Sequence, residues 1–357
     1  MKTQKNRKVM SLPKLILLDV LLIGVILLVF ASFHHVIPAI ISERERLEAM
    51  EQTVPATGAP ETEAPTEPEQ TEATEAQPEE TEAPTEPDNR TEWQKKFEDK
   101  FTDEVVITEN SYSSPEVSIT LQTVSTGEGN GKITYHIADI YVASLDNFVT
   151  HTANNEMRYF GTQDVLEMDA AANAILTLSG DFLTYQKGGF LMRNGEVYAA
   201  TTNLKSICVL YSDGTLATYE PGEYKIDDIV AAGAVQVWSF GPPLLDENGQ
   251  VKDHYDVSTA VSYPNPRSAI GYFEPGHYCF VLVDGRQEGY SKGMTISELA
   301  QIFADLGCTT AYNLDGGGSA VMVYNHQRYS QQSNGGDRDL GDILVIRDSY
   351  YTTQEEE

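Results

Sequence analysis

The chain has 357 residues, three cysteines and a formal net charge of −30 at pH 7. So large an acidic excess argues against nucleic acid and other polyanions as general partners, because no basic stripe replaces phosphate counterions. The odd number of cysteines, all in apolar stretches, favours buried thiols at Cys208, Cys279 and Cys308 over a disulfide framework. No Cys-x-x-Cys or Cys/His spacing indicates structural zinc.

An apolar segment near the N-terminus predicts a membrane anchor. Residues 15–33 are almost wholly apolar, and this length suits a transmembrane helix. Lys and Arg residues precede the segment and acidic sequence follows it, so the positive-inside rule places residues 1–14 in the cytoplasm and the rest outside. A cleaved signal peptide is the alternative. The long apolar run without a small-x-small site favours an uncleaved anchor over residues 15–36 of a single-pass cell-membrane protein, as in a Gram-positive bacterium.

A tract rich in Thr, Glu, Pro and Ala follows the anchor. The sequence of residues 61–68 recurs loosely at residues 80–87, with little apolar bulk and many like charges. Such a composition cannot offset the entropy of ordering, so we expect residues 37–90 to hold a juxtamembrane segment and an extended stalk. A lead-in segment (91–115), one domain (116–349) and an acidic tail (350–357) complete the predicted organisation.

The ectodomain alternates strand patterns with a few helices. Period-two alternation and buried apolar runs predict strands at residues 117–121, 133–142, 174–178, 190–193, 206–211, 234–239, 277–283 and 343–346. Helices are predicted at residues 92–101, 166–173 and 295–306. In the last of these, Thr295 and Glu298 form a capping box and Gly307 ends the helix. The pattern indicates an α+β domain with mixed β-sheets and a few flanking helices.

Polar clusters follow several predicted strands. They contain Asp181, Arg267, Asp284 with Arg286, and the run Asn313-Leu314-Asp315-Gly316-Gly317-Gly318-Ser319, with Asp337 and Arg338 beyond it. Three glycines let a ligand approach the backbone and allow positive φ. A ligand-free glycine turn is the alternative for the run, and an ordinary turn is the alternative for Asp284-Gly285. The combination of carboxylates and arginines at strand ends favours a functional site.

Other common active-site motifs are absent from the sequence. It has no Gly-x-Ser-x-Gly elbow, no P-loop and no His-Glu-x-x-His motif. Of the seven histidines only His277 stands out as a candidate binding residue, and a structural role is the alternative.

Several motifs in a fixed order resemble the phosphodiester glycosidase family. The matching segments are residues 179–182, 189–195, 238–242, 265–271, 283–286, 293–295, 313–319 and 337–338. The resemblance implies hydrolysis of a sugar-1-phosphate linkage within a phosphodiester, giving a free sugar and a phosphomonoester.

The resemblance also implies roles for the polar residues. A carboxylate must activate water or stabilise oxocarbenium character, and cationic donors must hold the departing phosphate. Asp315 is the leading carboxylate, with Asp284 and Asp181 as alternates. Arg267 and Arg338 are expected to bind phosphate. The predicted substrate-binding set also includes Asn313, Gly316, Gly317, Gly318, Ser319, Arg286 and His277.

No cofactor is required by the sequence, although Asp315 or Asp181 could hold a divalent cation such as Ca²⁺ or Mg²⁺. The expected partner is a glycan bearing a sugar phosphodiester, in the cell envelope or an exopolysaccharide. A second hypothesis is a non-catalytic protein of the envelope that binds polysaccharide or supports its assembly. The full set of aspartates and arginines favours an enzyme.

Overall fold

The computed structural model describes residues 90–155, 161–182, 189–201, 205–333, 336 and 338–351, which all fall in one compact unit. The predicted anchor (15–36), nearly all of the predicted stalk (37–90) and Asp337 lie outside these residues. Within the described ranges, no helix is both long and apolar enough to cross a membrane.

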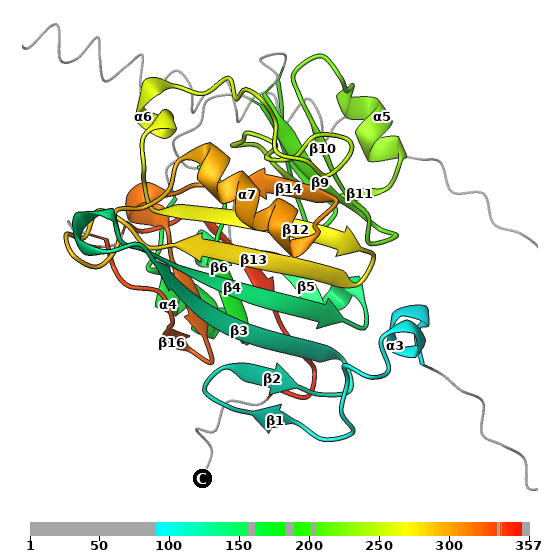
Figure 1. Cartoon of the computed structure of the whole chain (residues 1–357). Helices are drawn as coiled ribbons and strands as arrows, with labels where there is room; N and C mark the ends of the chain where they lie inside the picture. The colour runs from blue at the N-terminus through cyan, green and yellow to red at the C-terminus, as the bar shows by residue number, and fades with distance from the viewer. Residues whose placement is uncertain are drawn as a thin grey trace, which may run out of the picture. The chain divides into compact units, whose positions relative to one another are not determined.

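The largest sheet has seven strands in the order β1-β2-β3-β4-β13-β12-β14 (Figure 1). Its strands are β1 (Val106–Ile107), β2 (Ser111–Ser113), β3 (Val117–Thr126), β4 (Ile133–Val142), β12 (Arg267–Glu274), β13 (His277–Val283) and β14 (Thr310–Asn313). Because β1 pairs with β2 and β2 pairs with β3, the sheet already begins within the predicted lead-in segment.

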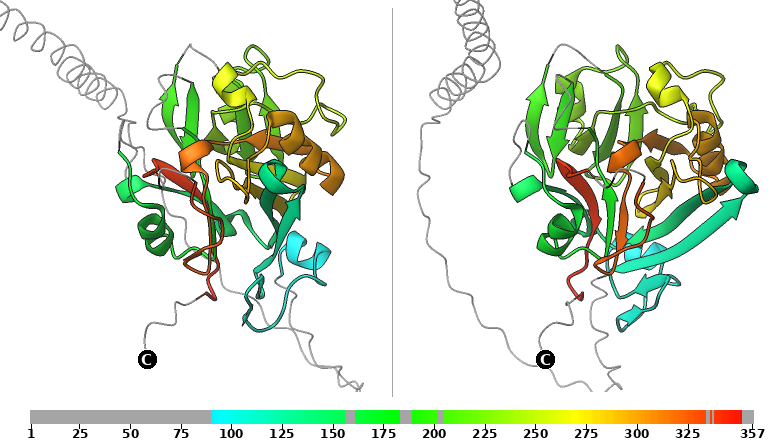
Figure 2. Two further views of the ribbon diagram at one scale, coloured as in Figure 1. Left: turned by 60° about the vertical axis from the view of Figure 1, so that its left-hand side comes forward. Right: turned by 90° about the vertical axis from the view of Figure 1, so that its left-hand side faces the viewer.

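Two five-stranded sheets accompany it, in the orders β10-β9-β11-β7-β8 and β16-β15-β6-β17-β5. Figure 2 shows β15 and β17, near the C-terminus, lying beside the much earlier β6. The bounds are β5 (Phe148–Thr152), β6 (Leu176–Ser179), β7 (Phe190–Arg193), β8 (Glu196–Ala200), β9 (Ile207–Tyr211), β10 (Leu216–Tyr219), β11 (Ala234–Trp238), β15 (Met322–Tyr324), β16 (Gln327–Arg328) and β17 (Asp342–Ile346).

The described helices are short. They are α3 (Glu92–Lys96), α4 (Val165–Ala171), α5 (Ile226–Ala231), α6 (Thr259–Ser262), α7 (Ile296–Leu306) and the 3₁₀ turns η2 (Gly129–Gly131), η3 (Leu145–Asn147), η4 (Ala153–Asn155) and η6 (Gly317–Ser319). The predicted capping of α7 is confirmed. The Thr295 hydroxyl accepts the Glu298 amide, the Glu298 side chain accepts the Thr295 amide, and Gly307 ends the helix at φ 83°.

Strand β13 shows how the core is built. Its alternate side chains bury on opposite faces of the sheet, as the period of two requires. Tyr278, Phe280 and Leu282 join the core shared with the two smaller sheets. The intervening Cys279, Val281 and Val283 pack with α7, which covers the outer face (Figure 1). This strand therefore reads as a continuous apolar run because both of its faces are covered.

The α+β class with few flanking helices is confirmed. The described strand pairs are antiparallel throughout, where the sequence predicts mixed sheets. Parallel pairs need long crossover connections, usually helical, and this domain has few helices to supply them. Strand β12 was not predicted, because its first residues, around Arg267, read as a polar cluster. The prediction of buried thiols is confirmed, since Cys208, Cys279 and Cys308 are all buried and free.

Gly271 lies where β12 packs closely against α7. A Cβ atom there would lie 2.6 Å from Phe303 Cδ1 and 2.7 Å from Cys279 Sγ. We expect Gly271→Ala to lower the free energy of unfolding by about 1–3 kcal/mol, because the well-packed core cannot absorb the methyl group without strain. Urea denaturation measures this. Gly131→Ala is the control, since nothing lies within 4 Å of its added Cβ. Equal effects of the two substitutions would contradict the packing argument.

Candidate functional site

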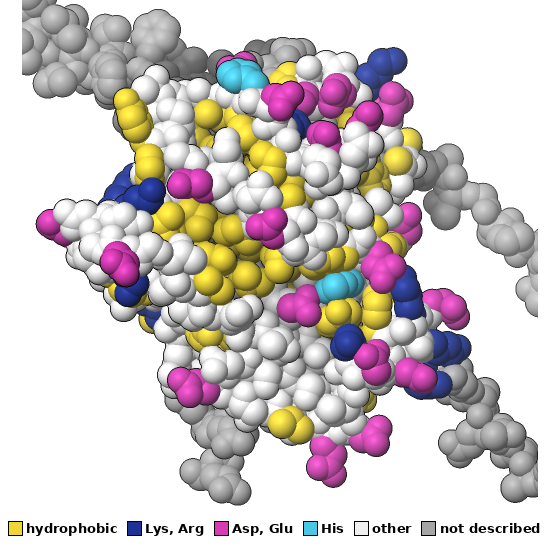
Figure 3. Space-filling model, in the orientation of Figure 1, with side chains coloured by type: hydrophobic (Ala, Val, Ile, Leu, Met, Phe, Trp, Pro, Cys, Tyr) yellow, Lys and Arg dark blue, Asp and Glu magenta, His cyan; other side chains and the backbone are white. Residues whose placement is uncertain are grey.

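Strand ends from two sheets meet at one edge of the seven-stranded sheet, namely the edge formed by the ends of neighbouring strands. The register pairs Arg267 with Val283 and Ala269 with Asn313, so β12 begins where β13 and β14 end. Ser179, the last residue of β6, reaches the same edge, where its hydroxyl lies 2.6 Å from that of Ser268. The segments after β6, β13 and β14 therefore converge, as their polar composition predicts. Figure 3 shows Lys and Arg side chains near this end of the sheet, on a surface with scattered acidic groups.

The glycine loop, residues 315–319, packs tightly against β12. A Cβ atom on Gly316 would lie 2.5 Å from the Pro266 carbonyl oxygen, and Gly317 has φ 65°. Glycine is required at both positions for these reasons. Most of the loop amides already have acceptors, because Gly317 N donates to Pro266 O and Ser319 N donates to Gly316 O. The loop is therefore a rigid support, and it offers few amides to a phosphate.

Asp315 is a buried carboxyl group at the start of this loop. It is 9% exposed, and its amide donates to Gly180 O over 3.1 Å. Burial raises the pKa of Asp315 to about 6, although the Ser319 hydroxyl, the Arg338 charge and the Gly316 amide all favour the ionised form. A carboxyl group with its pKa near neutrality can exchange a proton with a substrate or water.

Two arginines flank the loop. Arg338 Nη1 lies 3.9 Å from Asp315 Oδ2 and 3.4 Å from Ser319 Oγ. Its guanidinium also lies over the Phe182 ring, 6.0 Å from the centroid. On the other side, a Cβ atom on Gly317 would lie 2.9 Å from Arg286 Nη2, so the Arg286 guanidinium sits directly against the glycines. Both guanidinium groups are exposed to solvent.

Asp181 lies close enough to Asp315 to raise its pKa, but it is held by a buried cation. Arg193 Nη2 lies 2.9 Å from Asp181 Oδ2 and 2.8 Å from Asp342 Oδ2. All three side chains are buried, and the Ser239 amide also donates to Asp181 Oδ2. Asp181 Oδ1 has no hydrogen bond within the described part of the chain. We name Arg193, Asp181 and Asp342 the Arg193 cluster.

Asp284 belongs to a second network at the same edge. His136 Nε2 and the Tyr290 hydroxyl each lie 2.8 Å from Asp284 Oδ2, and the Gln331 amide donates to Asp284 Oδ1. Asp284 thus links the end of β13 to β4 and to the segment that leads towards Arg338. Its bonds indicate a positioning role for Asp284.

Arg267 is placed differently from the phosphate-binding role predicted for it. Its Nε donates to Met294 O, and its Nη2 donates to Val261 O and Tyr263 O. Burial, followed by repulsion from Arg286, lowers the pKa of Arg267 to about 10. The guanidinium therefore fixes the segment around α6, and Arg286 takes its place beside the glycine loop.

Two further predicted binding residues have structural partners. Asn313 is fully buried and donates to the Gly241 carbonyl. His277 lies at the start of β13, the opposite end from Asp284. There it bonds Asp139 over 2.7 Å and stacks on Tyr141. The structure does not bring His277 to the glycine loop, because a strand of seven residues separates them.

Arg193, Asp342 and His136 were missed as site residues. Arg193 carries the clearest signal in the sequence, since it is the one charge at the end of the apolar strand β7. Asp342 directly precedes the predicted strand 343–346. His136 reads only as an alternating strand residue, so its partner Asp284 could not be inferred. Among the described residues, no group of three or more His, Cys, Asp and Glu side chains is arranged to hold a metal ion.

Known proteins match this chain over the region that contains these motifs. The family model described as phosphodiester glycosidase matches residues 172–347, which confirms the resemblance predicted from the sequence. The SPbeta prophage-derived protein YomE of Bacillus subtilis is 28% identical over 197 residues, covering 53% of this chain and 30% of that protein. Mouse N-acetylglucosamine-1-phosphodiester alpha-N-acetylglucosaminidase is 24% identical over 169 residues, covering 43% of this chain and 32% of that protein. The chain thus spans about a third of the length of these relatives.

A solved structure supports the fold. The catalytic domain of the zebrafish N-acetylglucosamine-1-phosphodiester alpha-N-acetylglucosaminidase, auto-inhibited by its pro-peptide, superimposes with a TM-score of 0.54. The match covers 69% of this chain and 88% of that domain at 21% identity. The two proteins therefore share their fold.

The raised pKa of Asp315 predicts a stability cost at neutral pH. The folded protein holds the Asp315 proton up to a pKa of about 6, whereas the ordinary value is 3.8. Stability is therefore lost as the pH rises from about 4 to about 6, at ~1.4 kcal/mol per unit. We expect Asp315→Asn, which is always neutral, to be about 2–3 kcal/mol more stable than wild type at pH 7.5 and equally stable near pH 4.

Urea unfolding of both proteins at the two pH values measures this difference. If the wild type is instead more stable than Asp315→Asn at pH 7.5, the local hydrogen bonds outweigh the effect of burial. The pKa of Asp315 would then not lie near neutrality.

Proposed function

We propose that this chain, which carries the phosphodiester glycosidase match over residues 172–347, is a hydrolase that cleaves a sugar-1-phosphate linkage within a phosphodiester. The observation that best supports this proposal is the buried Asp315 carboxyl group. Two basic side chains, Arg286 and Arg338, lie on either side of its glycine loop. The curated relatives named for this activity in mouse and human support the proposal.

The two arginines suit the phosphate. A planar guanidinium donates to two phosphate oxygens at once and keeps its charge at any physiological pH. Arg286 is oriented by Asn265, whose side-chain oxygen accepts its Nη2 over 2.9 Å. Arg338 is fixed at its backbone, where its amide donates to Gly318 O. A phosphate held between them would lie over the glycines, because those residues have no side chain to block it.

Asp315 suits the sugar end of the scissile bond. Above its pKa of about 6 the carboxylate can accept a proton from an attacking water, or stabilise positive charge at the anomeric carbon. The bond from that carbon to the phosphate oxygen breaks, water supplies the new hydroxyl group, and the phosphomonoester leaves with the bonding electrons. A phosphomonoester is a good leaving group, so the reaction needs little help from a general acid.

The proposed reaction requires no cofactor. If a Ca²⁺ or Mg²⁺ ion takes part, the unpartnered Asp181 Oδ1 and the Asp315 carboxylate are the oxygen atoms that would bind it. Activity that survives EDTA treatment would rule out such an ion.

The N-terminal sequence supports a location outside the cytoplasm. Residues 15–36 would anchor the chain in the cell membrane, and residues 37–90 would hold the domain away from it. An envelope glycan or exopolysaccharide with phosphodiester-linked sugars is the substrate that such an enzyme would reach. A non-catalytic glycan-binding protein is the alternative, and the activity measurements below distinguish the two.

Asp315→Asn is expected to lower kcat for release of free sugar by about 10²–10⁴-fold, because the neutral amide cannot take a proton. The assay follows reducing sugar released from UDP-linked and p-nitrophenyl sugar-1-phosphate diesters, over a panel of sugars. Wild-type kcat/KM should fall as the pH drops below about 6, where Asp315 becomes protonated. Asp305→Asn, the same change at an exposed position on α7, is the control. Full activity of Asp315→Asn would remove Asp315 from the mechanism.

Arg286→Ala and Arg338→Ala are each expected to lower kcat/KM by about 10²–10³-fold without loss of folding, because each removes a donor to the departing phosphate. Arg267→Ala should instead lower Tm, since three carbonyl groups lose their donor. Arg90→Ala, at an exposed residue near the start of the described chain, is the control. A kinetic defect confined to Arg267→Ala would reverse the assignment of Arg267 and Arg286.

A further inference from the structure

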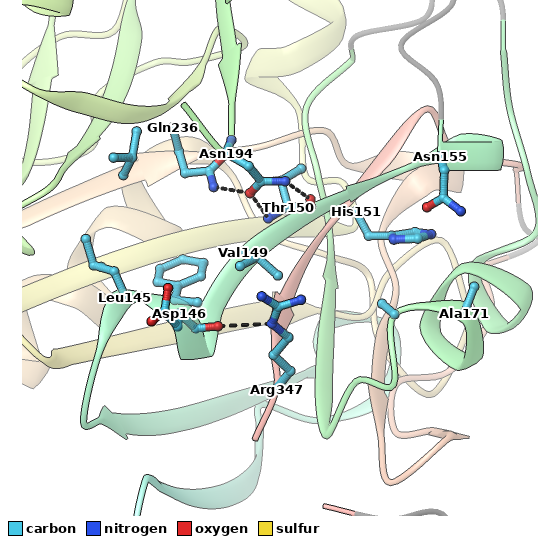
Figure 4. A pocket seen from close by; sticks show the side chains of 13 residues that line it. Leu145, Asp146, Val149, Thr150, His151, Asn155, Ala171, Asn194, Gln236 and Arg347 are labelled. Carbon is cyan, nitrogen blue, oxygen red and sulfur yellow. Dashed lines mark hydrogen bonds between the residues drawn. The ribbon is translucent and has the colours of Figure 1, made fainter. Parts of the chain in front are cut away.

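The cavity beside β5 is lined by polar groups that bond to one another (Figure 4). The Asn194 side chain bonds both the Thr150 backbone and the Gln236 side chain, and Arg347 Nε donates to the Asp146 carbonyl. These bonds connect β5 with β11 and with the turn after β7, so the groups have structural partners. The reactive side chains that the glycine-loop site leaves unused are instead the cysteine thiols.

Two of the three cysteines are in contact. Cys279 Sγ, on β13, lies 3.6 Å from Cys308 Sγ, between α7 and β14. Both residues are buried, and Cys208 belongs to β9 and to a different core cluster. The two sulfur atoms of a disulfide lie about 2.05 Å apart, so a shift of about 1.5 Å would join this pair.

The backbone around β12 brings the two cysteines together. The register places Cys279 directly opposite Gly271 of β12. The Thr309 amide donates to the Tyr272 carbonyl over 2.9 Å, which fixes the residue after Cys308 against the same strand. A Cβ atom on Gly271 would lie 2.7 Å from Cys279 Sγ. The glycine therefore leaves space for the Cys279 sulfur atom beside that of Cys308.

We propose that Cys279 and Cys308 form a disulfide bond when the chain folds outside the cytoplasm, the location proposed above. The bond ties β13 to the start of β14 and stabilises the fold. Strand β13 ends next to Asp284 and β14 leads into Asp315, so the bond links the two strands that carry these carboxyl groups. A single bond also agrees with the odd number of cysteines, because Cys208 remains as a thiol. The bond is independent of the proposed hydrolysis.

The bond forms by thiol–disulfide exchange, with a small-molecule or protein disulfide as the oxidant. The thiolate of one cysteine attacks the oxidant, which gives a mixed disulfide and releases one thiol. The second cysteine then attacks the sulfur atom of the first and releases the other thiol. The two cysteines together lose two electrons and two protons, and the oxidant becomes two thiols.

Burial determines when this exchange takes place. It raises the pKa of the Cys279 thiol, so the folded protein holds little of the thiolate that attacks a disulfide. Both cysteines also pack in the cluster that α7 covers. The exchange therefore takes place during folding, before α7 packs on the sheet.

The test counts the thiols of the full chain after it is unfolded in urea with a reductant and refolded in reduced and oxidised glutathione. Alkylation in denaturant and mass spectrometry should find one thiol, at Cys208, and a peptide pair joined through Cys279 and Cys308. The chain refolded in reductant should hold three thiols. A cooperative thermal transition identifies folded protein in both samples. Chain isolated from a host membrane, with its thiols alkylated at lysis, gives the same count without refolding.

The oxidised protein is expected to have a Tm about 5–10 °C above that of the reduced protein, because the bond restricts the unfolded chain. The bonded positions are 29 residues apart. Cys279→Ala and Cys308→Ala should each abolish the difference in Tm between oxidised and reduced samples. Cys208→Ala, which removes a buried thiol from the other core cluster, is the matched control and should retain it.

Three free thiols in folded protein prepared with oxidised glutathione would overturn the proposal. A bond that includes Cys208 would do the same. A bond between Cys279 and Cys308 that leaves Tm unchanged would contradict its stabilising role. None of these measurements uses the hydrolase assay, so this proposal and the proposed function can fail separately.

Discussion

The ion pairs of Arg193 with Asp181 and Asp342 are the interaction on which the site depends. Arg193 ends β7 of one five-stranded sheet, whereas Asp342 begins β17 of the other and Asp181 follows β6 of that same sheet. A buried guanidinium must keep its partners close, since removal of one partner from such a pair typically costs 3–5 kcal/mol. The cluster therefore fixes how these two sheets meet. It also fixes Gly180, which receives the Asp315 amide and joins the glycine loop to the same junction.

At this junction the Asp315 carboxyl group lies in an environment that disfavours its ionised form. Asp315 is buried beside a second acidic group, Asp181, and both its burial and that neighbour raise its pKa. The folded state bears that electrostatic cost at neutral pH. Electrostatic costs of this kind are common at functional sites. A group with a pKa near neutrality is useful for catalysis there and only destabilises the fold elsewhere.

The local features of the chain could be predicted well from the sequence. The capping of α7 by Thr295 depends on residues three positions apart, and the buried alternation of β13 depends on residues two positions apart. Strand β12 was missed because Arg267 and its neighbours are polar, and only burial against β13 and β14 makes them a central strand. The site was predicted in part. Asp315, Arg338 and Arg286 come together, whereas Arg267 and His277 find other partners.

The sequence by itself determined which segments form strands and helices, the acidic character of the chain and the glycine loop, because these follow from patterns over a few neighbouring residues. Only the tertiary structure decided which arginine faces that loop and which aspartate is buried beside a cation. Arg193 and Asp342 are 149 residues apart, and a hydrogen bond over that separation leaves no local pattern.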